Sequence, residues 1–331
     1  MSVSVDEKDS VNKVLKLEKN LCSDVIGQPK AIEVVANSLK RSISKIQDPN
    51  KPIGSFLFVG TTGVGKTFLA KMLCKELFDS AEKIVQVDMS ELKESHSISK
   101  LIGSPPGYIG YDKGGKLTEN IRRNPYSLIL FDEIEKAHPE VLNVLLQLLE
   151  EGKLTDGIGR TINFKNTIVV MTTNIGAEKV ISPEPLGFVT PTKEEKKDMG
   201  SEMALEEIKK QLKPELINRI DEIVVFNNLS KDDLYKIVDI NFILYKDRLM
   251  SNYGITIELD KTAKELFIEK GYDEKYGARE LKRTIQRYFE TSIAEILLAG
   301  KYKEGETIVC FCKNDELKYR RKSTRGKRRR P

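Results

Sequence analysis

The chain has 331 residues, 39% hydrophobic and 32% charged, which is typical of a soluble globular protein of about two domains. No apolar run reaches the roughly 18 residues of a membrane helix, and the first thirty residues lack a signal-peptide core, so we expect neither membrane association nor a targeting signal in this chain. The net charge of +5 depends on eight basic residues in the last twelve positions, without which the chain is near −3. This balance argues against a nucleic-acid-binding body.

The first two thirds of the chain alternate predicted helices with short apolar strands. Residues 29–46 repeat apolar side chains at helical spacing, "GSFLFVG" predicts a buried strand, and a helix follows over residues 66–78. Further strands are predicted in "KIVQVDMS", "YSLILFDE", "NTIVVMTTN" and "DEIVVF", with a helix in "HPEVLNVLLQLLEEG". Such apolar strands, alternating with helices, predict an α/β fold with a parallel sheet covered by helices.

After residue 228 the pattern becomes mainly helical. Ser230 is a predicted helix N-cap, with Asp233 completing a capping box, and two more helices are expected near residues 261–270 and 277–299. A short strand, "ETIVCFC", closes this region. We therefore expect a charged lead-in or linker, a large α/β domain, a small mainly helical domain and a basic disordered tail, at residues 1–22, 23–228, 229–316 and 317–331.

The segment "GTTGVGKT" matches the phosphate-binding pattern G-x-x-x-x-G-K-[ST] between a predicted strand and a predicted helix. Its glycines let backbone N–H groups surround phosphate oxygens, and the helix N-terminus adds its dipole. We expect Lys66 to reach the β- and γ-phosphates and Thr67 to bind Mg²⁺. ATP and Mg²⁺ are thus the predicted cofactors, held by Gly60, Thr61, Thr62, Gly63, Val64, Gly65, Lys66, Thr67 and Phe68.

Acidic and amide side chains follow two of the predicted strands. "LILFDE" ends in Asp132 and Glu133, which we expect at the carboxyl edge of the sheet beside the phosphates. Asp132 is a candidate for the Mg²⁺ shell, and Glu133 for the general base that activates water. Asn174 ends the fourth strand and could orient that water, although asparagine at a strand end is usually a turn residue.

Two arginines could stabilise charge on the transferred phosphoryl group. Arg219 lies in "LINRIDEIVVF", before the fifth strand, and Arg279 lies in "YGARELKR" of the second domain. An arginine at that place contributes about 10³-fold or more to phosphoryl transfer. A lone arginine is more often a surface charge, so both candidates depend on their motifs.

These motifs resemble, in their order, AAA+ ATPases, and more narrowly the C-terminal ATPase module of the Clp unfoldase chaperones, ClpC most of all. The similar segments cover residues 20 to about 315 and include "DVIGQ", "LIGSPPGYIGYDKGG", "LFDEIEKAHPEVLNVLLQLLEEGKLTD", "NRIDEIVVF" and "YGARELKR". The resemblance implies an AAA+ P-loop fold, ATP hydrolysis and a hexameric ring. It also implies that Lys66 belongs to Walker A, Asp132 and Glu133 to Walker B, and Asn174 to sensor 1.

The same resemblance implies roles for residues that spacing alone does not explain. Arg219 is similar to the arginine finger that reaches a neighbour's ATP, and Arg279 to sensor 2. Val25 and Ile26 match the apolar contacts to adenine. Thr61 stands where the family usually carries proline. Threonine at this position should make the loop less rigid without removing a phosphate contact.

The resemblance also explains the apolar residues in the glycine-rich loop "SPPGYIGYDKGG". In the family, this loop faces the channel of the ring and grips an unfolded polypeptide, here with Tyr108 and Ile109 between Gly107 and Gly110. An aromatic side chain makes large contacts that tolerate any sequence, and glycines let it move. The alternative is that Tyr108 anchors the loop to its own domain.

A second apolar island, "PLGFV", lies in a charged, proline-containing loop. It resembles the loop with which ClpC-type unfoldases dock onto the ClpP peptidase, so Leu186, Gly187 and Phe188 are candidates for docking. The alternative is an apolar staple folded against the body of the protein.

The implied function is an ATP-dependent protein unfoldase and translocase that threads polypeptides through a hexameric ring into a ClpP-type peptidase. The alternatives are a ClpB-like disaggregase without a protease partner and a P-loop nucleic-acid motor. The basic tail favours the nucleic-acid motor slightly, whereas the acidic body and the aromatic loop with Tyr108 argue against it, so we expect no nucleic-acid partner.

We expect an intracellular location. With many Ile and Asn, the 40 lysines among the 55 basic residues indicate an AT-rich source. Because ClpC-type unfoldases occur in bacterial cytoplasm and in plastids, a plastid (chloroplast or apicoplast) stroma is favoured over bacterial cytoplasm.

Overall fold

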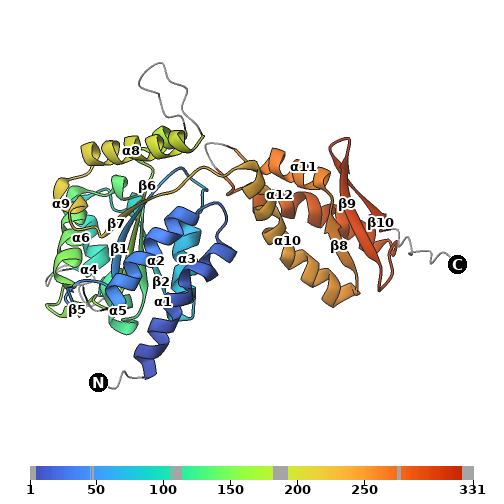
Figure 1. Ribbon diagram of the computed structural model, residues 1–331. Helices are drawn as coiled ribbons and strands as arrows, with labels where there is room; N and C mark the ends of the chain where they lie inside the picture. The colour runs from blue at the N-terminus through green and yellow to red at the C-terminus, as the bar shows by residue number, and fades with distance from the viewer. Residues whose placement is uncertain are drawn as a thin grey trace, which may run out of the picture. The chain divides into compact units, whose positions relative to one another are not determined.

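The computed structural model describes residues 5–44, 46, 48–104, 107, 114–181, 193–273 and 277–322. The chain forms two compact units, Met1–Asn228 and Leu229–Pro331 (Figure 1). In the part of the chain that is described, we find no helix with the length and apolar composition that crossing a membrane requires.

The first unit is built on a five-stranded sheet whose neighbouring strands are all parallel. The strand order is β2-β3-β6-β1-β7, so the first strand of the chain lies inside the sheet, between two later strands. This confirms the predicted parallel sheet. The strands are β1 (Gly54–Val59), β2 (Ile84–Asp88), β3 (Leu128–Asp132), β6 (Ile168–Thr173) and β7 (Glu222–Val225).

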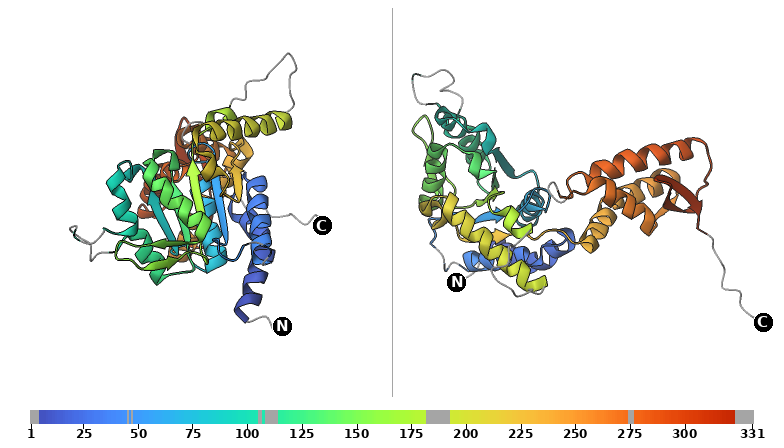
Figure 2. Two further views of the ribbon diagram at one scale, coloured as in Figure 1. Left: turned by 90° about the vertical axis from the view of Figure 1, so that its left-hand side faces the viewer. Right: turned by 90° about the horizontal axis from the view of Figure 1, so that it is seen from above.

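Helices cover both faces of this sheet, which is why its inner strands β1, β3 and β6 are buried along almost their whole length. Phe56 and Phe58 of β1 belong to one core with α1, α2 and α3, whereas Leu57 and Val59 belong to a second core with α5 and α6. The left view of Figure 2 shows the sheet between these two helical layers. The helices are α1 (Val5–Asp24), α2 (Pro29–Ile43), α3 (Lys66–Phe78), α4 (Ile98–Ile102), α5 (Lys116–Arg123), α6 (Pro139–Glu151), α7 (Ala177–Ile181), α8 (Lys193–Gln211) and α9 (Pro214–Ile217), with short turns η1 (Met89–Glu91), η2 (Ser95–Ser97) and η3 (Ile134–Lys136).

Helix α1 corrects the expectation of a separate lead-in at residues 1–22. Val14, Leu17 and Leu21 are almost completely buried in the same core as α2 and α3. The spacing of these three residues places them on one helical face. The described residues 5–24 are therefore part of the first unit.

The sequence did not predict the two-stranded hairpin of β4 (Lys153–Thr155) and β5 (Thr161–Asn163). At its tip, the Asp156 carboxylate accepts hydrogen bonds from the N–H groups of Ile158 and Arg160, at 3.2 and 2.8 Å. The Arg160 guanidinium binds Asp156 at 2.6 Å and also Glu119 of α5. The hairpin is thereby tied to the unit by charged side chains.

The second unit combines helices with a three-stranded sheet of order β10-β9-β8. Its first helix begins with the predicted capping box, because the Ser230 and Asp233 side chains each accept from the other's backbone N–H. Phe242, Phe267 and Phe289 are buried in its core. The elements are α10 (Lys231–Tyr253), β8 (Thr256–Leu259), α11 (Lys261–Gly271), α12 (Leu281–Ile285), a π-helical turn η4 (Gln286–Glu290), α13 (Thr291–Leu298), β9 (Thr307–Lys313) and β10 (Glu316–Arg321).

Strand β10 corrects the predicted disordered tail at residues 317–331. Residues 316–321 pair antiparallel with β9, and Leu317 is buried. Leu317 and Tyr319 lie two residues apart, so they share one face of the strand and pack on the core although charged residues surround them. Residues 323–331 lie outside the described part of the chain.

Candidate functional site

The loop between β1 and α3 has the backbone geometry of a phosphate-binding loop. Gly65, at the N-cap of α3, has φ = +111°, a conformation that strains residues with a side chain. A Cβ atom on Gly60 would lie 3.0 Å from the Cβ of Phe226, so the start of the loop is tightly packed. Among the described residues no side chain caps α3. Its first N–H groups therefore face the loop, where an anion can accept from them.

Lys66 extends back over this loop and is only 8% exposed. Its Nζ donates to the backbone oxygens of Gly60 and Thr61, at 3.1 Å for the latter, and to Oδ1 of Asn174 at 2.9 Å. A buried ammonium needs such acceptors, and phosphate oxygens are stronger acceptors than carbonyls. The ammonium is thus held beside the loop with partners that a phosphate can replace. Thr67 follows in the first turn of α3 and is half-buried.

Asp132 ends β3 at the carboxyl edge of the sheet, as predicted. Phe131 pairs with Met171 of β6, which places the next residues, Asp132 and Thr172, beside each other. The Thr172 hydroxyl donates to Oδ1 of Asp132, and Gln86 of β2 donates to Oδ2 at 3.4 Å. Sequence reasoning missed both supporting residues because their contacts depend on strand order and register.

Glu133 has φ = +58°, the left-handed conformation, which costs a non-glycine residue about 1–2 kcal/mol. Its N–H donates to the Thr172 hydroxyl at 3.0 Å, and this bond helps to hold the backbone in that conformation. Its carboxylate lies 3.5 Å from Nδ2 of Asn174. Thr172 therefore contacts both acids at the end of β3, Asp132 and Glu133.

Asn174 connects the two halves of the site. Its Oδ1 accepts from Lys66 and its Nδ2 lies against Glu133, while its backbone N–H donates to Glu135 at 3.2 Å. The structure thus brings together four of the predicted residues at one edge of the sheet: Lys66, Asp132, Glu133 and Asn174.

The predicted adenine contacts lie in the turn between α1 and α2. Val25 is 3% exposed and packs in the core, whereas Ile26 is half-buried. Gln28, for which the sequence predicted no role, is fully buried; its Nε2 donates to the backbone oxygens of Val64, at 3.1 Å, and Asn227, at 2.8 Å. Gln28 thereby joins this turn to the phosphate-binding loop. In the sequence it stood out only as the last residue of the "DVIGQ" segment, to which no role was assigned.

The two predicted arginines lie in different units. Nε and Nη2 of Arg219 donate to Oε2 of Glu150 on α6, at 3.1 and 2.7 Å, and Nη1 donates to the backbone oxygen of Glu215 at 3.0 Å. Arg279 is exposed in the turn before α12 of the second unit. Its action on nucleotide stays a prediction.

Comparison with known proteins identifies the family. A family model described as "AAA domain (Cdc48 subfamily)" matches residues 51–223, more than half of the chain. A second, described as the "C-terminal, D2-small domain, of ClpB protein", matches residues 229–310. The chain belongs to the AAA+ ATPases of the Clp family. A third model, described as Torsin, matches residues 2–94.

Similar Clp proteins come from several bacteria. Chaperone protein ClpB of Aquifex aeolicus is 46% identical over 315 residues, which are 95% of this chain and 31% of that protein. ClpB of Prochlorococcus marinus is 48% identical over 297 residues, 90% of this chain and 33% of that protein. The chain therefore spans about a third of the length of these Clp relatives. They support neither the ClpC type nor a plastid location.

The two loops that the Clp resemblance connected with partners lie mostly outside the described residues. Tyr108, Ile109 and Gly110 are not described, nor are Leu186, Gly187 and Phe188. Gly107 is exposed, with φ = +93°. At the described ends of this loop the backbone is tightly packed: a Cβ on Gly115 would lie 2.1 Å from the Leu101 oxygen, and Gly157 of the hairpin donates to the Ile102 oxygen at 2.8 Å.

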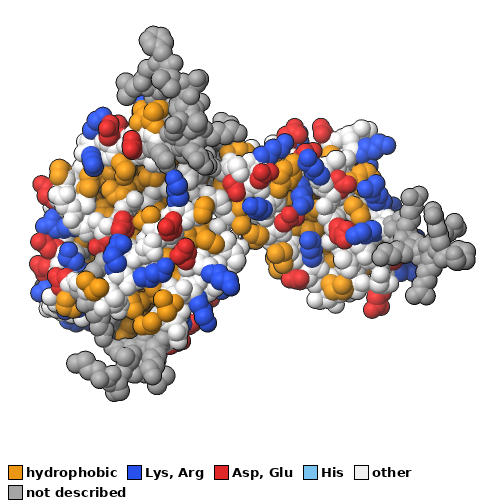
Figure 3. All heavy atoms as spheres, viewed as in Figure 1, with side chains coloured by type: hydrophobic (Ala, Val, Ile, Leu, Met, Phe, Trp, Pro, Cys, Tyr) orange, Lys and Arg blue, Asp and Glu red, His pale blue; other side chains and the backbone are white. Residues whose placement is uncertain are grey.

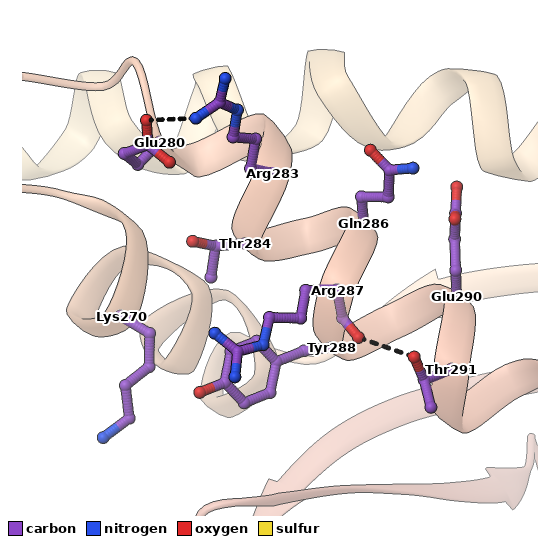
Figure 4. Close-up of a pocket in the computed structure, with 9 residues that line it drawn as sticks. All are labelled: Lys270, Glu280, Arg283, Thr284, Gln286, Arg287, Tyr288, Glu290 and Thr291. Carbon is purple, nitrogen blue, oxygen red and sulfur yellow. Dashed lines mark hydrogen bonds and ion pairs between the residues drawn. The ribbon is translucent and has the colours of Figure 1, made fainter.

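A cavity of about 610 Å³ lies in the second unit of this Clp module, beside α12 and η4 (Figure 4). Its two arginines are directed at neighbours: Arg283 pairs with Glu280 at 3.3 Å, and Arg287 lies over the Tyr288 ring, 5.9 Å from its centroid. The described residues that line it include none of the predicted site residues. It therefore adds nothing to the nucleotide site.

Proposed function

We propose that this chain is the ATP-hydrolysing motor module of a ClpB-type chaperone, which extracts polypeptides from aggregates. The observation that carries the ATPase part is the cluster of Lys66, Asp132, Glu133 and Asn174 beside the phosphate-binding loop. The names of the relatives support the disaggregase in preference to the peptidase-feeding unfoldase.

The loop fits the phosphates of ATP. The N–H groups at the start of α3 and the Lys66 ammonium provide donors on one side of the site, and Gly65 leaves room for close approach. As phosphate binds, Lys66 exchanges backbone oxygens for phosphate oxygens. The exchange keeps a buried positive charge paired throughout.

The oxygen ligands expected of a Mg²⁺ site are also present. The Thr67 hydroxyl and the Asp132 carboxylate would hold the ion, and Mg²⁺ would supply neutralisation of the charge that develops on the phosphates. Thr172 and Gln86 orient the Asp132 carboxylate by donating to its two oxygens. One carboxylate fits Mg²⁺, which keeps much of its water shell.

The remaining polar groups fit the activation of water. Glu133 would accept the proton of the attacking water, and Asn174 would hold that water and the Glu133 carboxylate in position. The contact between Asn174 and Lys66 connects this step with the occupancy of the phosphate site.

Assembly into a hexameric ring would bring Arg219 to a neighbour's ATP. Its pairing with Glu150 at the surface is an exposed ion pair, which contributes only about 0–1 kcal/mol, so it can exchange for phosphate. Arg279 would report nucleotide to the second unit. In the channel, Tyr108 would grip the polypeptide through sequence-tolerant contacts.

The other two functions have less support. Docking to ClpP through Leu186, Gly187 and Phe188 depends on the motif alone; equal recovery of ClpP by the wild type and by Phe188→Ala would rule it out. A nucleic-acid motor would need a basic surface, whereas on the face in Figure 3 basic and acidic side chains are interspersed over both units.

The central test measures ATP hydrolysis and the recovery of a heat-aggregated reporter enzyme by the assembled protein. Lys66→Ala should abolish nucleotide binding, and Glu133→Gln should bind ATP but hydrolyse it at least about 100-fold more slowly. Lys71→Ala, an exposed lysine of the same helix, is the matched control and should behave as the wild type. ATP hydrolysis without any reporter recovery would refute the disaggregase, and no hydrolysis by the wild type would refute the motor itself.

A further inference from the structure

Glu135 is an acidic residue beside the nucleotide site for which the proposed mechanism has no role. It lies in the turn η3, two residues after Glu133. Its Oε1 accepts the backbone N–H of Asn174 at 3.2 Å. Its Oε2 is buried and has no hydrogen-bond partner in the described part of the chain. Burying a carboxylate oxygen without a partner is unfavourable, so this placement calls for an explanation.

The N–H that Glu135 accepts belongs to the first residue beyond a strand. Strand β6 ends at Thr173, so the sheet ladder does not extend to Asn174. The next N–H along, of Ile175, turns back to the Thr173 hydroxyl at 3.1 Å, which shows that the chain leaves the sheet direction here. The Glu135 carboxylate provides the Asn174 N–H with a strong, charge-assisted partner at this bend.

The direction of the Asn174 side chain depends on this bend. Its amide bridges two groups on different elements, Lys66 at 2.9 Å and Glu133 at 3.5 Å. An amide reaches two such partners only when its backbone is held, because a short side chain has little freedom to compensate for a displacement. The hydrogen bond from the Asn174 N–H to Glu135 therefore helps to determine whether the Asn174 amide reaches both Lys66 and Glu133.

We propose that Glu135 is a positioning residue for ATP hydrolysis, which fixes the backbone of Asn174 so that its amide contacts Lys66 and Glu133 together. This inference rests on the proposed ATPase function. Glu135 contacts the site through the backbone N–H of Asn174, and its effect passes through that residue. Oε1 of Glu135 makes this bond, and Oε2 is buried because the carboxylate is held in that position.

The test compares ATPase kinetics of Glu135→Ala and Glu135→Gln in the assembled protein. Alanine removes the acceptor, so we expect kcat to fall at least about tenfold while KM stays within about twofold, because Lys66 and the loop still bind phosphate. Glutamine keeps an acceptor oxygen and should restore kcat to within about threefold of the wild type. Glu140→Ala, an exposed acid on α6, is the matched control.

A double-mutant cycle with Asn174→Ala separates positioning from a structural role. If Glu135 acts through the Asn174 side chain, Glu135→Ala should lower kcat by less than about twofold once that side chain is absent. An undiminished loss in the Asn174→Ala background, or wild-type kcat in Glu135→Ala, would overturn the inference. Should Glu135→Ala unfold, a tenfold loss in folded Glu135→Gln would overturn it as well. A wild type without ATPase activity would instead remove the proposed function on which the inference rests.

Discussion

At the scale of single residues, Thr172 has more influence on the site than its sequence suggests. It is 1% exposed, its hydroxyl donates to the Asp132 carboxylate, and the same oxygen accepts the N–H of Glu133. A single hydroxyl therefore orients the candidate metal ligand and helps to hold the candidate base in its left-handed conformation. Both effects follow from the register of β3 and β6.

Thr172→Val should weaken the site while preserving its shape. Valine has nearly the volume of threonine but neither donates nor accepts, so the half-buried Asp132 carboxylate loses a partner at a cost of about 1 kcal/mol. We expect the Mg²⁺ concentration for half-maximal ATPase activity to rise and kcat to fall about tenfold. Thr172→Ser keeps the hydroxyl and should stay close to the wild type. Equal kinetics for valine and threonine would exclude this role.

At the scale of elements, the β4–β5 hairpin is connected with α5 by charged side chains. Arg160 of the hairpin binds Glu119 of α5, which also binds Arg122 at 2.9 Å. The Arg122 and Arg160 guanidinium groups lower the pKa of the Glu119 carboxyl to about 2. Because α5 begins just after the loop that contains Tyr108, this cluster lies at the base of the predicted polypeptide-gripping loop.

The lowered pKa predicts an acid-sensitive contribution to stability. Folding lowers the pKa of Glu119 from 4.5 to about 2, so its stabilisation is complete above about pH 4.5 and is lost as the pH falls towards 2. Arg160→Ala should lower the melting temperature at neutral pH and reduce this loss on acidification. Lys153→Ala, an exposed lysine of the same hairpin, should leave the pH profile unchanged. The same profile in Arg160→Ala and the wild type would contradict the assignment.

At the scale of the whole molecule, the chain consists of two units with separate cores. The first unit buries residues on both faces of its parallel sheet, and the second gathers three phenylalanines, Phe242, Phe267 and Phe289, between helices and a small sheet. Phe289 packs edge-on against Phe242, with ring centroids 4.6 Å apart. Strand β10 packs on this second core, and the Tyr319 hydroxyl forms a hydrogen bond with the Ser292 hydroxyl of α13.

Truncation distinguishes the strand from the tail that follows it. Ending the chain after Lys322 removes residues 323–331, whose basic, Gly- and Ser-containing sequence predicts a disordered tail, and should leave thermal unfolding of the second unit unchanged. Ending it after Asp315 removes β10, including buried Leu317, and should destabilise that unit by about 3 kcal/mol or more. Equal melting curves for the two truncations would show that β10 adds nothing to the fold.

The local features of the sequence were enough to predict much of this protein. The glycine and lysine spacing of the phosphate-binding loop, the apolar runs that end in Asp132 and Asn174, and the capping box at Ser230 all depend on neighbours in the chain. Such features need no knowledge of the fold, because the groups that form them lie within a few residues of one another in the chain. The parallel sheet followed from how uniformly apolar the strands are.

Only the tertiary structure decided which distant residues support the site. Gln86 and Thr172 contact it from strands whose order in the sheet differs from their order in the chain, and Gln28 contacts the phosphate-binding loop from the turn before α2, so spacing along the sequence carries no sign of these contacts. Likewise α1 and β10 look like charged termini, because only their buried faces are apolar and the partners of those faces lie elsewhere in the chain. Strand order and register are global properties, since they result from packing the whole core at once.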